Sequence, residues 1–261
     1  MKNKRRQFGF SLIEVLMAMG VLTVGMLMVA GTFPVGIHLT AVSTERTLGA
    51  VAADEAFAKI RLYGSRMNLS SVTLTASNTQ KTYDFNDVYT NYTNTSDKIT
   101  SSEFEYPSVL GAQIDKRYNW SALFRFSNVN DANQCQITVF VSRKVSDAMQ
   151  YYSQALTTYA PTTSPISSRP VPTLIGSVSG SQNQNYINVS AANIVYFSDD
   201  SVIVDNATGK IYRVIELDQV AGVIYLDRKL EDAVSDIWVV PVPIDGGKNP
   251  CVGVYQRIIN F

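Results

Sequence analysis

A single acidic residue, Glu14, lies near the start of a long apolar segment of this 261-residue chain. The segment begins at Phe10, and after Glu14 no Asp, Glu, Lys or Arg follows until Glu45. A helix needs about 20 mainly apolar residues to cross a bilayer, so this segment is long enough to span one. A carboxylate in the middle of such a helix costs about 2.5–3.5 kcal/mol, and less near an end. We therefore expect Glu14 to have a role, and a partner that neutralises its charge.

A junction at Gly9 and Phe10 separates the apolar segment from a short basic leader, residues 1–9. A secretory signal peptide is cut after a short apolar core, whereas here the core follows the junction. Cleavage at Gly9 would therefore leave the whole apolar segment on the mature chain. By the positive-inside rule the basic leader stays on the cytoplasmic side, and the chain beyond about residue 40 lies outside the cytoplasm. The basic residues of the leader are Lys2, Lys4, Arg5 and Arg6.

The run Phe10-Ser-Leu-Ile-Glu-Val-Leu, preceded by Gly9, resembles the processing motif of the type IV pilin and type II secretion pseudopilin superfamily. The resemblance covers about the first 50 residues. It implies cleavage after Gly9 by a prepilin peptidase, N-methylation of Phe10 and assembly of residues 10–63 as the core helix of a filament. It also implies that Glu14 neutralises the N-terminal amine of a neighbouring subunit. The continuation from Ala18 to Leu27 is most similar to minor pilins of the pilus-modification type and to the matching minor pseudopilins.

The same resemblance implies the partners and the location of the chain. The partners are other pilin subunits, the prepilin peptidase, an inner-membrane assembly platform and, before assembly, the lipid bilayer. The subunit would cross the inner membrane once and then enter an extracellular or periplasmic filament that serves cell adhesion or secretion. A minor pilin is the first hypothesis, and a minor or major pseudopilin or a tip subunit that binds a surface or substrate is the alternative. An ordinary single-pass membrane anchor is the simplest competing interpretation.

Composition and motifs argue against nucleic-acid binding and against an enzyme. The chain has 22 basic and 22 acidic residues, and removal of the leader leaves 18 against 22, a net charge of about −4. A mildly acidic protein has no electrostatic basis for binding nucleic acid. The single histidine, His38, lies in the apolar helix, so a Ser-His-Asp site in the rest of the chain is excluded. No Walker, Rossmann or zinc-protease pattern occurs, and we expect no cofactor.

Two further pairs of residues each have two interpretations, one chemical and one purely structural. Cys135 and Cys251 lie in the part expected outside the cytoplasm, where a disulfide can form, and the alternative is two free, buried thiols. Asp245 and Asn249, in the run Asp-Gly-Gly-Lys-Asn, are a weak calcium candidate because calcium binds carboxylate and carbonyl oxygens. Asp and Asn next to Gly are more often turn formers, so we predict no metal site there.

The predicted fold is α+β. A long helix over residues 10–66, with its membrane-spanning part at 10–33, has a second, amphipathic half in which Ala53, Phe57 and Ile60 recur at helical spacing. We expect this stripe to pack on an antiparallel β-sheet. Pro34 predicts a kink or local melting of the helix, because proline removes a backbone donor.

The rest of the chain divides into a pilin-like head, a linker and a second module. Residues 67–158 combine an irregular connection with strands at 120–127 and 134–145, residues 159–184 form a Pro/Ser/Thr-rich linker, and residues 185–245 form a β-rich module, a small barrel or sandwich. Residues 246–261 contain a last strand, 252–260, that returns to the head sheet beside 134–145. The strands expected in the module are 194–197, 201–204, 211–217, 223–226 and 237–242.

Overall fold

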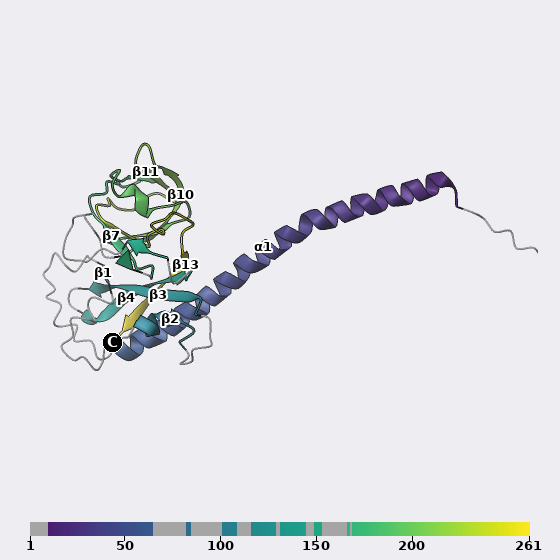
Figure 1. The fold of residues 1–261 in the computed structure, drawn as a ribbon. Coiled ribbons are helices and arrows are strands. Elements are labelled where there is room, and N and C mark those ends of the chain that lie inside the picture. The colour runs from purple at the N-terminus through teal and green to yellow at the C-terminus, as the bar shows by residue number, and fades with distance from the viewer. Residues whose placement is uncertain are drawn as a thin grey trace, which may run out of the picture. The chain divides into compact units, whose positions relative to one another are not determined.

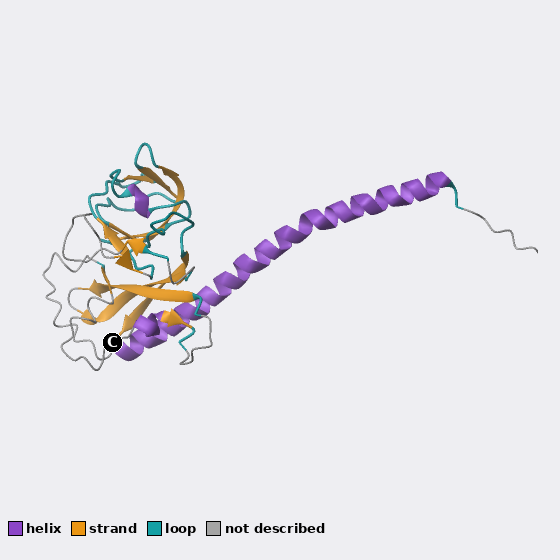
Figure 2. Cartoon of the chain, viewed as in Figure 1, coloured by secondary structure: helices purple, strands orange, loops and turns teal. Residues whose placement is uncertain are grey.

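The structure is a computed structural model, and it describes residues 10–64, 82–84, 101–108, 116–128, 131–144, 149–152, 166–167 and 169–261. Packing divides the chain into two compact units, Met1–Thr47 and Leu48–Phe261, which we describe separately. We call the second one the head unit. One long helix and two main antiparallel sheets make up the described chain (Figures 1 and 2), so the α+β class predicted from the sequence is confirmed.

Helix α1 (Leu12–Gly64) begins at a capping pattern of the Ser-x-x-Glu type. The backbone N–H of Glu14 donates to the Ser11 hydroxyl oxygen at 3.3 Å and to the Ser11 carbonyl at 3.1 Å. Further along, hydroxyls of threonines donate to carbonyls four residues earlier, as Thr23 does to Met19 at 2.7 Å. These local bonds satisfy the polar side chains of an otherwise apolar helix without partners from elsewhere.

Pro34 lies inside α1, and the helix continues on both sides of it. Proline has no backbone N–H, so the carbonyl of Ala30 loses its usual helical donor. The chain is helical at this position. The kink or local melting predicted at Pro34 stays a prediction.

The first sheet of the head unit, which we call the head sheet, has the strand order β1-β3-β4-β13, and β2 also pairs with β3. Asn128 pairs with Asp131 at the end of the β3–β4 hairpin. Strand β13 pairs with β4 from Cys251, opposite Ser142, to Asn260, opposite Gln134. The last strand therefore lies where the sequence analysis expects it. The strands are β1 (Tyr83–Asp84), β2 (Glu105–Tyr106), β3 (Tyr118–Asn128), β4 (Asp131–Arg143) and β13 (Cys251–Asn260).

The last four turns of α1 cover one face of the head sheet. Ala53, Phe57 and Ile60 are all at most 2% exposed and belong to the same core as Phe124 and Val139 of the sheet. Because their spacing follows the helical period, one stripe of α1 is buried while the opposite side stays in solvent. The predicted packing of the amphipathic half on a sheet is thereby confirmed.

The second main sheet has six strands in the order β7-β12-β9-β10-β11-β8. Its two end strands approach each other, because Ser179, four residues after β7, pairs with Asn188 of β8. The sheet therefore curls into a partly closed barrel around its own core, which includes Ile203, Val214 and Ile224. The strands are β7 (Thr173–Ile175), β8 (Tyr186–Asn188), β9 (Val202–Asp205), β10 (Ile211–Asp218), β11 (Val223–Leu226) and β12 (Ile237–Val239).

The structure corrects two boundaries of this second sheet, and we call residues 173–250 the β module. β7 lies inside the segment 159–184 that the sequence predicts as a linker, because three residues, Thr-Leu-Ile, are too few to reveal a strand by periodicity. The expected strand at 194–197 is instead the short 3-10 helix η4 (Ile194–Tyr196). Ile194 and Tyr196 are buried there. The apolar alternation therefore predicted which side chains are buried but not the conformation of the backbone.

The β module packs on the face of the head sheet that α1 leaves free. Neighbouring residues of a strand point to opposite faces, so Phe124 faces α1 while Leu123 faces the module. Leu123 and Phe140 share a buried cluster with Trp238 and Val240 of the module. The module is therefore anchored to the head sheet through a continuous apolar core. Residues 159–165 and 168 of the predicted linker lie outside the described residues.

Cys135 and Cys251 are not bonded to each other. Cys135 lies opposite Ile259, so along β13 it is eight positions away from Cys251. At about 3.3 Å per residue this is on the order of 25 Å, whereas a disulfide needs Cα atoms about 4.4–6.8 Å apart. The disulfide considered from the sequence is wrong. The alternative, two free thiols, holds, because antiparallel pairing places the cysteines at opposite ends of one ladder.

Candidate functional site

The first turn of α1 holds the residues that the sequence singled out for chemistry. Phe10 is 81% exposed, and Ser11 caps the helix through the backbone of Glu14. The Glu14 carboxylate therefore belongs to the first turn, where the helix dipole presents partial positive charge and stabilises an anion. Gly9 lies outside the described residues.

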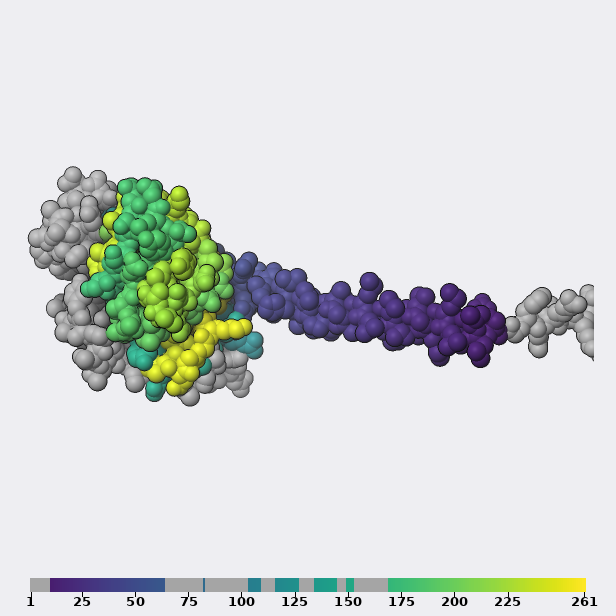
Figure 3. All heavy atoms as spheres, turned by 90° about the horizontal axis from the view of Figure 1, so that it is seen from above, coloured from purple at the N-terminus to yellow at the C-terminus, as the bar shows by residue number. Residues whose placement is uncertain are grey.

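The helix around Glu14 has an apolar surface on all sides. Within Met1–Thr47 the large apolar side chains from Phe10 to Leu39 are between 46% and 82% exposed. In Figure 3 the side chains of this segment form a bare rod coloured purple. By length and composition the segment is a transmembrane helix, since a helix apolar all round is buried either in protein or in lipid.

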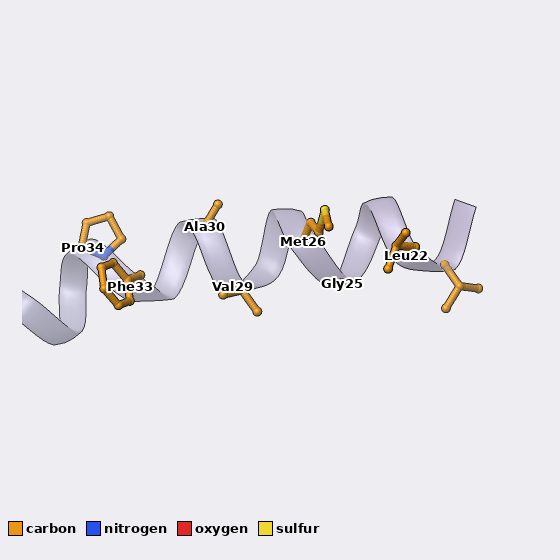
Figure 4. Close-up of a pocket in the computed structure, with 8 residues that line it drawn as sticks. Leu22, Gly25, Met26, Val29, Ala30, Phe33 and Pro34 are labelled. Carbon is orange, nitrogen blue, oxygen red and sulfur yellow. The ribbon is translucent and has the colours of Figure 1, made fainter. Parts of the chain in front are cut away.

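One side of this rod carries a shallow apolar hollow that is open to its surroundings and is lined by residues of this one helix (Figure 4). Gly25 has no side chain, and a Cβ built there would meet nothing within 4 Å. Met26, Phe33 and Pro34 stand along the same stretch of helix. The hollow is too open and too uniformly apolar to orient a small polar ligand. It is suited to lipid chains or to the side chains of another apolar helix.

Glu14 has no ion-pair partner among the described residues of its own chain. Along α1 the next charged side chain is Glu45, about 46 Å further at 1.5 Å per residue. A partner for the carboxylate in a low-dielectric environment must therefore come from the chain's own N-terminal end or from a second molecule. The α-amine that cleavage would create at Phe10 has the required positive charge.

The far end of α1 is fixed to the head unit by polar contacts that the sequence did not reveal. Arg257 of β13 places a guanidinium nitrogen 2.6 Å from the Asp54 carboxylate and its guanidinium carbon 4.7 Å from the centre of the Phe57 ring. Lys59 donates to the Glu103 carbonyl at 2.6 Å. These partners lie 44 to 203 residues apart in the chain, and only the fold brings them together.

Asn249, which the sequence offered as a calcium ligand, and the acidic turn at Asp205 both have partners within the chain. The side-chain amide of Asn249 donates to the Asp200 carbonyl at 3.2 Å, while its oxygen accepts the Cys251 N–H at 2.9 Å. The carboxylate of Asp205 accepts the backbone N–H groups of Ala207 and Thr208, both in its own turn. Among the described residues no three His, Cys, Asp or Glu side chains group as metal ligands would. The calcium site at Asp245 and Asn249 stays untested.

Comparison with known families assigns the N-terminal segment. Residues 4–30 match the family model described as the prokaryotic N-terminal methylation motif. The chain carries the leader signature of type IV pilins and pseudopilins. The matched range includes the Gly9–Phe10 junction, Ser11 and Glu14. The residues of the pilin-like motif are therefore also those that form the capped first turn of α1. The motif marks structural pilin-like subunits that are cleaved by a prepilin peptidase and assemble with other pilins.

The rest of this pilin-like chain has no such assignment. No curated protein and no solved structure matches the sequence. A role for the head unit must therefore be inferred from its own residues.

Proposed function

We propose that the protein is a minor subunit of a type IV pilus-like filament, cleaved after Gly9, methylated at Phe10 and assembled from the inner membrane. The observation that carries the proposal is Glu14. It is the one charged residue in the apolar part of α1, and it lies in a capped first turn at the membrane end of the helix. A carboxylate retained at such a place is best explained by a cation that arrives from a neighbouring subunit.

The orientation of the subunit follows from the charges on the two sides of the apolar segment. The leader holds four basic residues and no acid, and this keeps residues 1–9 in the cytoplasm. The head unit then lies outside the cytoplasm. The chain acts as a structural subunit rather than an enzyme, and its mechanism is transfer of α1 from lipid into a bundle of helices.

The charge on Glu14 is tested by Glu14→Ala and Glu14→Gln, with Glu45→Ala as the matched control on the same helix. Removing one partner of a desolvated ion pair costs about 3–5 kcal/mol, so incorporation into filaments should fall by at least about tenfold. Mass spectrometry of membranes should still find the mature N-terminus in both variants. Normal incorporation of Glu14→Gln into sheared filaments would refute the proposed role, since that variant keeps the shape and loses only the charge.

The minor status is tested separately by quantitative mass spectrometry of sheared surface filaments. We expect a mature N-terminal peptide that begins at methylated Phe10, and we expect its amount to be a few per cent of that of the most abundant pilin. Dominance of this chain in the filaments would make it the major subunit. Its absence from them, with Met1–Gly9 still attached in the membrane, would leave an ordinary membrane anchor. A filament that depends on a secretion system for its assembly would make it a pseudopilin.

A further inference from the structure

A groove of about 440 Å³ opens on the β module, within the head unit. Four segments meet at it: β5 (Tyr151–Tyr152), residues 195–199 in and after η4, residues 217–219 at the end of β10, and residues 242–247. Its volume lies in the range of about 300–1,000 Å³ that is typical of binding sites. All residues that line the groove belong to the head unit, and none of them is part of the apolar segment on which the proposed function rests.

Apolar side chains and polar groups share the wall of the groove, and the polar groups expose the larger area. Tyr152, Val195, Leu217 and Pro243 all line it. The Tyr152 ring is held edge-on by Tyr196, with the two ring centres 5.2 Å apart. Val195 is 51% exposed although it is aliphatic. A ligand that covers these side chains would gain about 25 cal/mol for each Å² of apolar surface removed from water.

Hydrogen bonds hold the segments of the groove in place. The Asp199 carboxylate accepts the Leu217 N–H at 3.1 Å, and this ties the residues after η4 to the end of β10. On the other side, the Ile244 N–H donates to the Gln150 carbonyl at 3.0 Å. At Gly246 a Cβ would meet nothing within 4 Å, so that side of the groove is open. A groove shaped in advance loses little conformational freedom when it binds.

The charge around the groove is negative. Asp199 is the one charged residue among those that line it, and its side chain is exposed. The β module, residues 173–250, contains ten acidic and five basic residues, a net charge of −5. The mature chain as a whole has a net charge of about −4, so the excess negative charge is concentrated on this module. Such a field attracts a cationic ligand and repels an anionic one.

We propose that this groove binds a segment of a partner polypeptide in which an apolar side chain lies next to a lysine or arginine. The apolar side chain would fill the space between Val195, Leu217 and Pro243, and the cation would pair with Asp199.

The proposal is tested with the full processed chain in phosphatidylcholine nanodiscs, with empty nanodiscs as the blank. The probes are three fluorescein-labelled nonapeptides in which leucine alternates with lysine, glutamate or serine. The leucine–lysine peptide should bind most tightly. Asp199→Asn, which retains the acceptor for Leu217, should weaken its affinity by about three- to tenfold, as expected for one partly exposed ion pair.

Two matched pairs of variants make the result specific to the groove. Asp200→Asn removes the same charge one residue away, outside the lining, and should leave the affinity unchanged. Val195→Lys places a cation in the groove and should abolish binding, whereas Val220→Lys adds the same charge at a fully exposed turn and should not. The proposal would be overturned if the two variants of either pair changed the affinity equally. It would also be overturned if the leucine–glutamate peptide bound as tightly as the leucine–lysine peptide. Displacement of the peptide by maltohexaose would also overturn it, in favour of a saccharide site.

Discussion

A buried polar side chain adds to the apolar contacts between the β module and the head sheet, and its removal is a sharp test of the packing. Asn206 is 5% exposed, in the turn after β9. Its side-chain oxygen accepts the Trp238 indole N–H at 2.9 Å and the Thr82 N–H at 3.1 Å. The Thr82 N–H also reaches the Asn206 carbonyl at 3.0 Å. The substitution Asn206→Ala would therefore leave the Trp238 indole N–H without this partner. The Thr82 N–H would keep the backbone carbonyl of residue 206 as its acceptor.

The expected loss follows from that difference. A buried donor left unpaired costs about 1–3 kcal/mol, so Asn206→Ala should lower the free energy of unfolding by about 2 kcal/mol. In a Trp238→Phe background the donor is already gone, and the same substitution should cost less than about 1 kcal/mol. The double-mutant cycle should then give a coupling energy of about 1–2 kcal/mol between the two side chains.

Urea unfolding of the full chain in detergent, followed by tryptophan fluorescence, measures these energies. The chain has two tryptophans, Trp120 in the head sheet and Trp238 in the module, and in Trp238→Phe only Trp120 reports. Asn193→Ala is the control, because the Asn193 side chain makes no cap bond to η4, and it should change stability by less than about 0.5 kcal/mol. If Asn206→Ala costs the same in both backgrounds, the Trp238 contact does not stabilise the junction and the reasoning fails.

Further outcomes depend on the burial of single side chains. Phe57→Ala should lower the free energy of unfolding by about 3–5 kcal/mol, whereas Val51→Ala, at a position 47% exposed on the same helix, should cost less than about 0.5 kcal/mol in the same urea titration. Burial raises the pKa of the Cys251 thiol to about 12, so at pH 8 iodoacetamide should label this residue only after unfolding. The thiol of the unfolded chain has the lower pKa, so it loses its proton at a lower pH than the thiol of the folded chain. The free energy of unfolding should therefore fall as the pH rises from about 9 towards 12. A native mass lower by two hydrogen atoms without reductant would show a disulfide and contradict the strand register.

Local features of the sequence were enough to predict the N-terminal part of the protein. The Gly9–Phe10 junction and the lone charge at Glu14 lie within a few residues of each other, so a short stretch of sequence was enough to reveal them. An uncharged segment of this length likewise implies a spanning helix without knowledge of the rest. The α1 stripe and the β3–β4 hairpin were predictable for the same reason, since periodicity and turn residues act over a few positions.

Long-range pairing was beyond such reasoning. The register of β13 on β4 separates Cys135 from Cys251, although both residues looked able to form a bond. β7 became visible as a strand only through its pairing with β12, and the groove exists only because segments from 151 to 247 meet on one side of the module. Contacts between residues far apart in the chain depend on the packing of whole elements, and no local pattern encodes which sheet edge or face a short segment will reach.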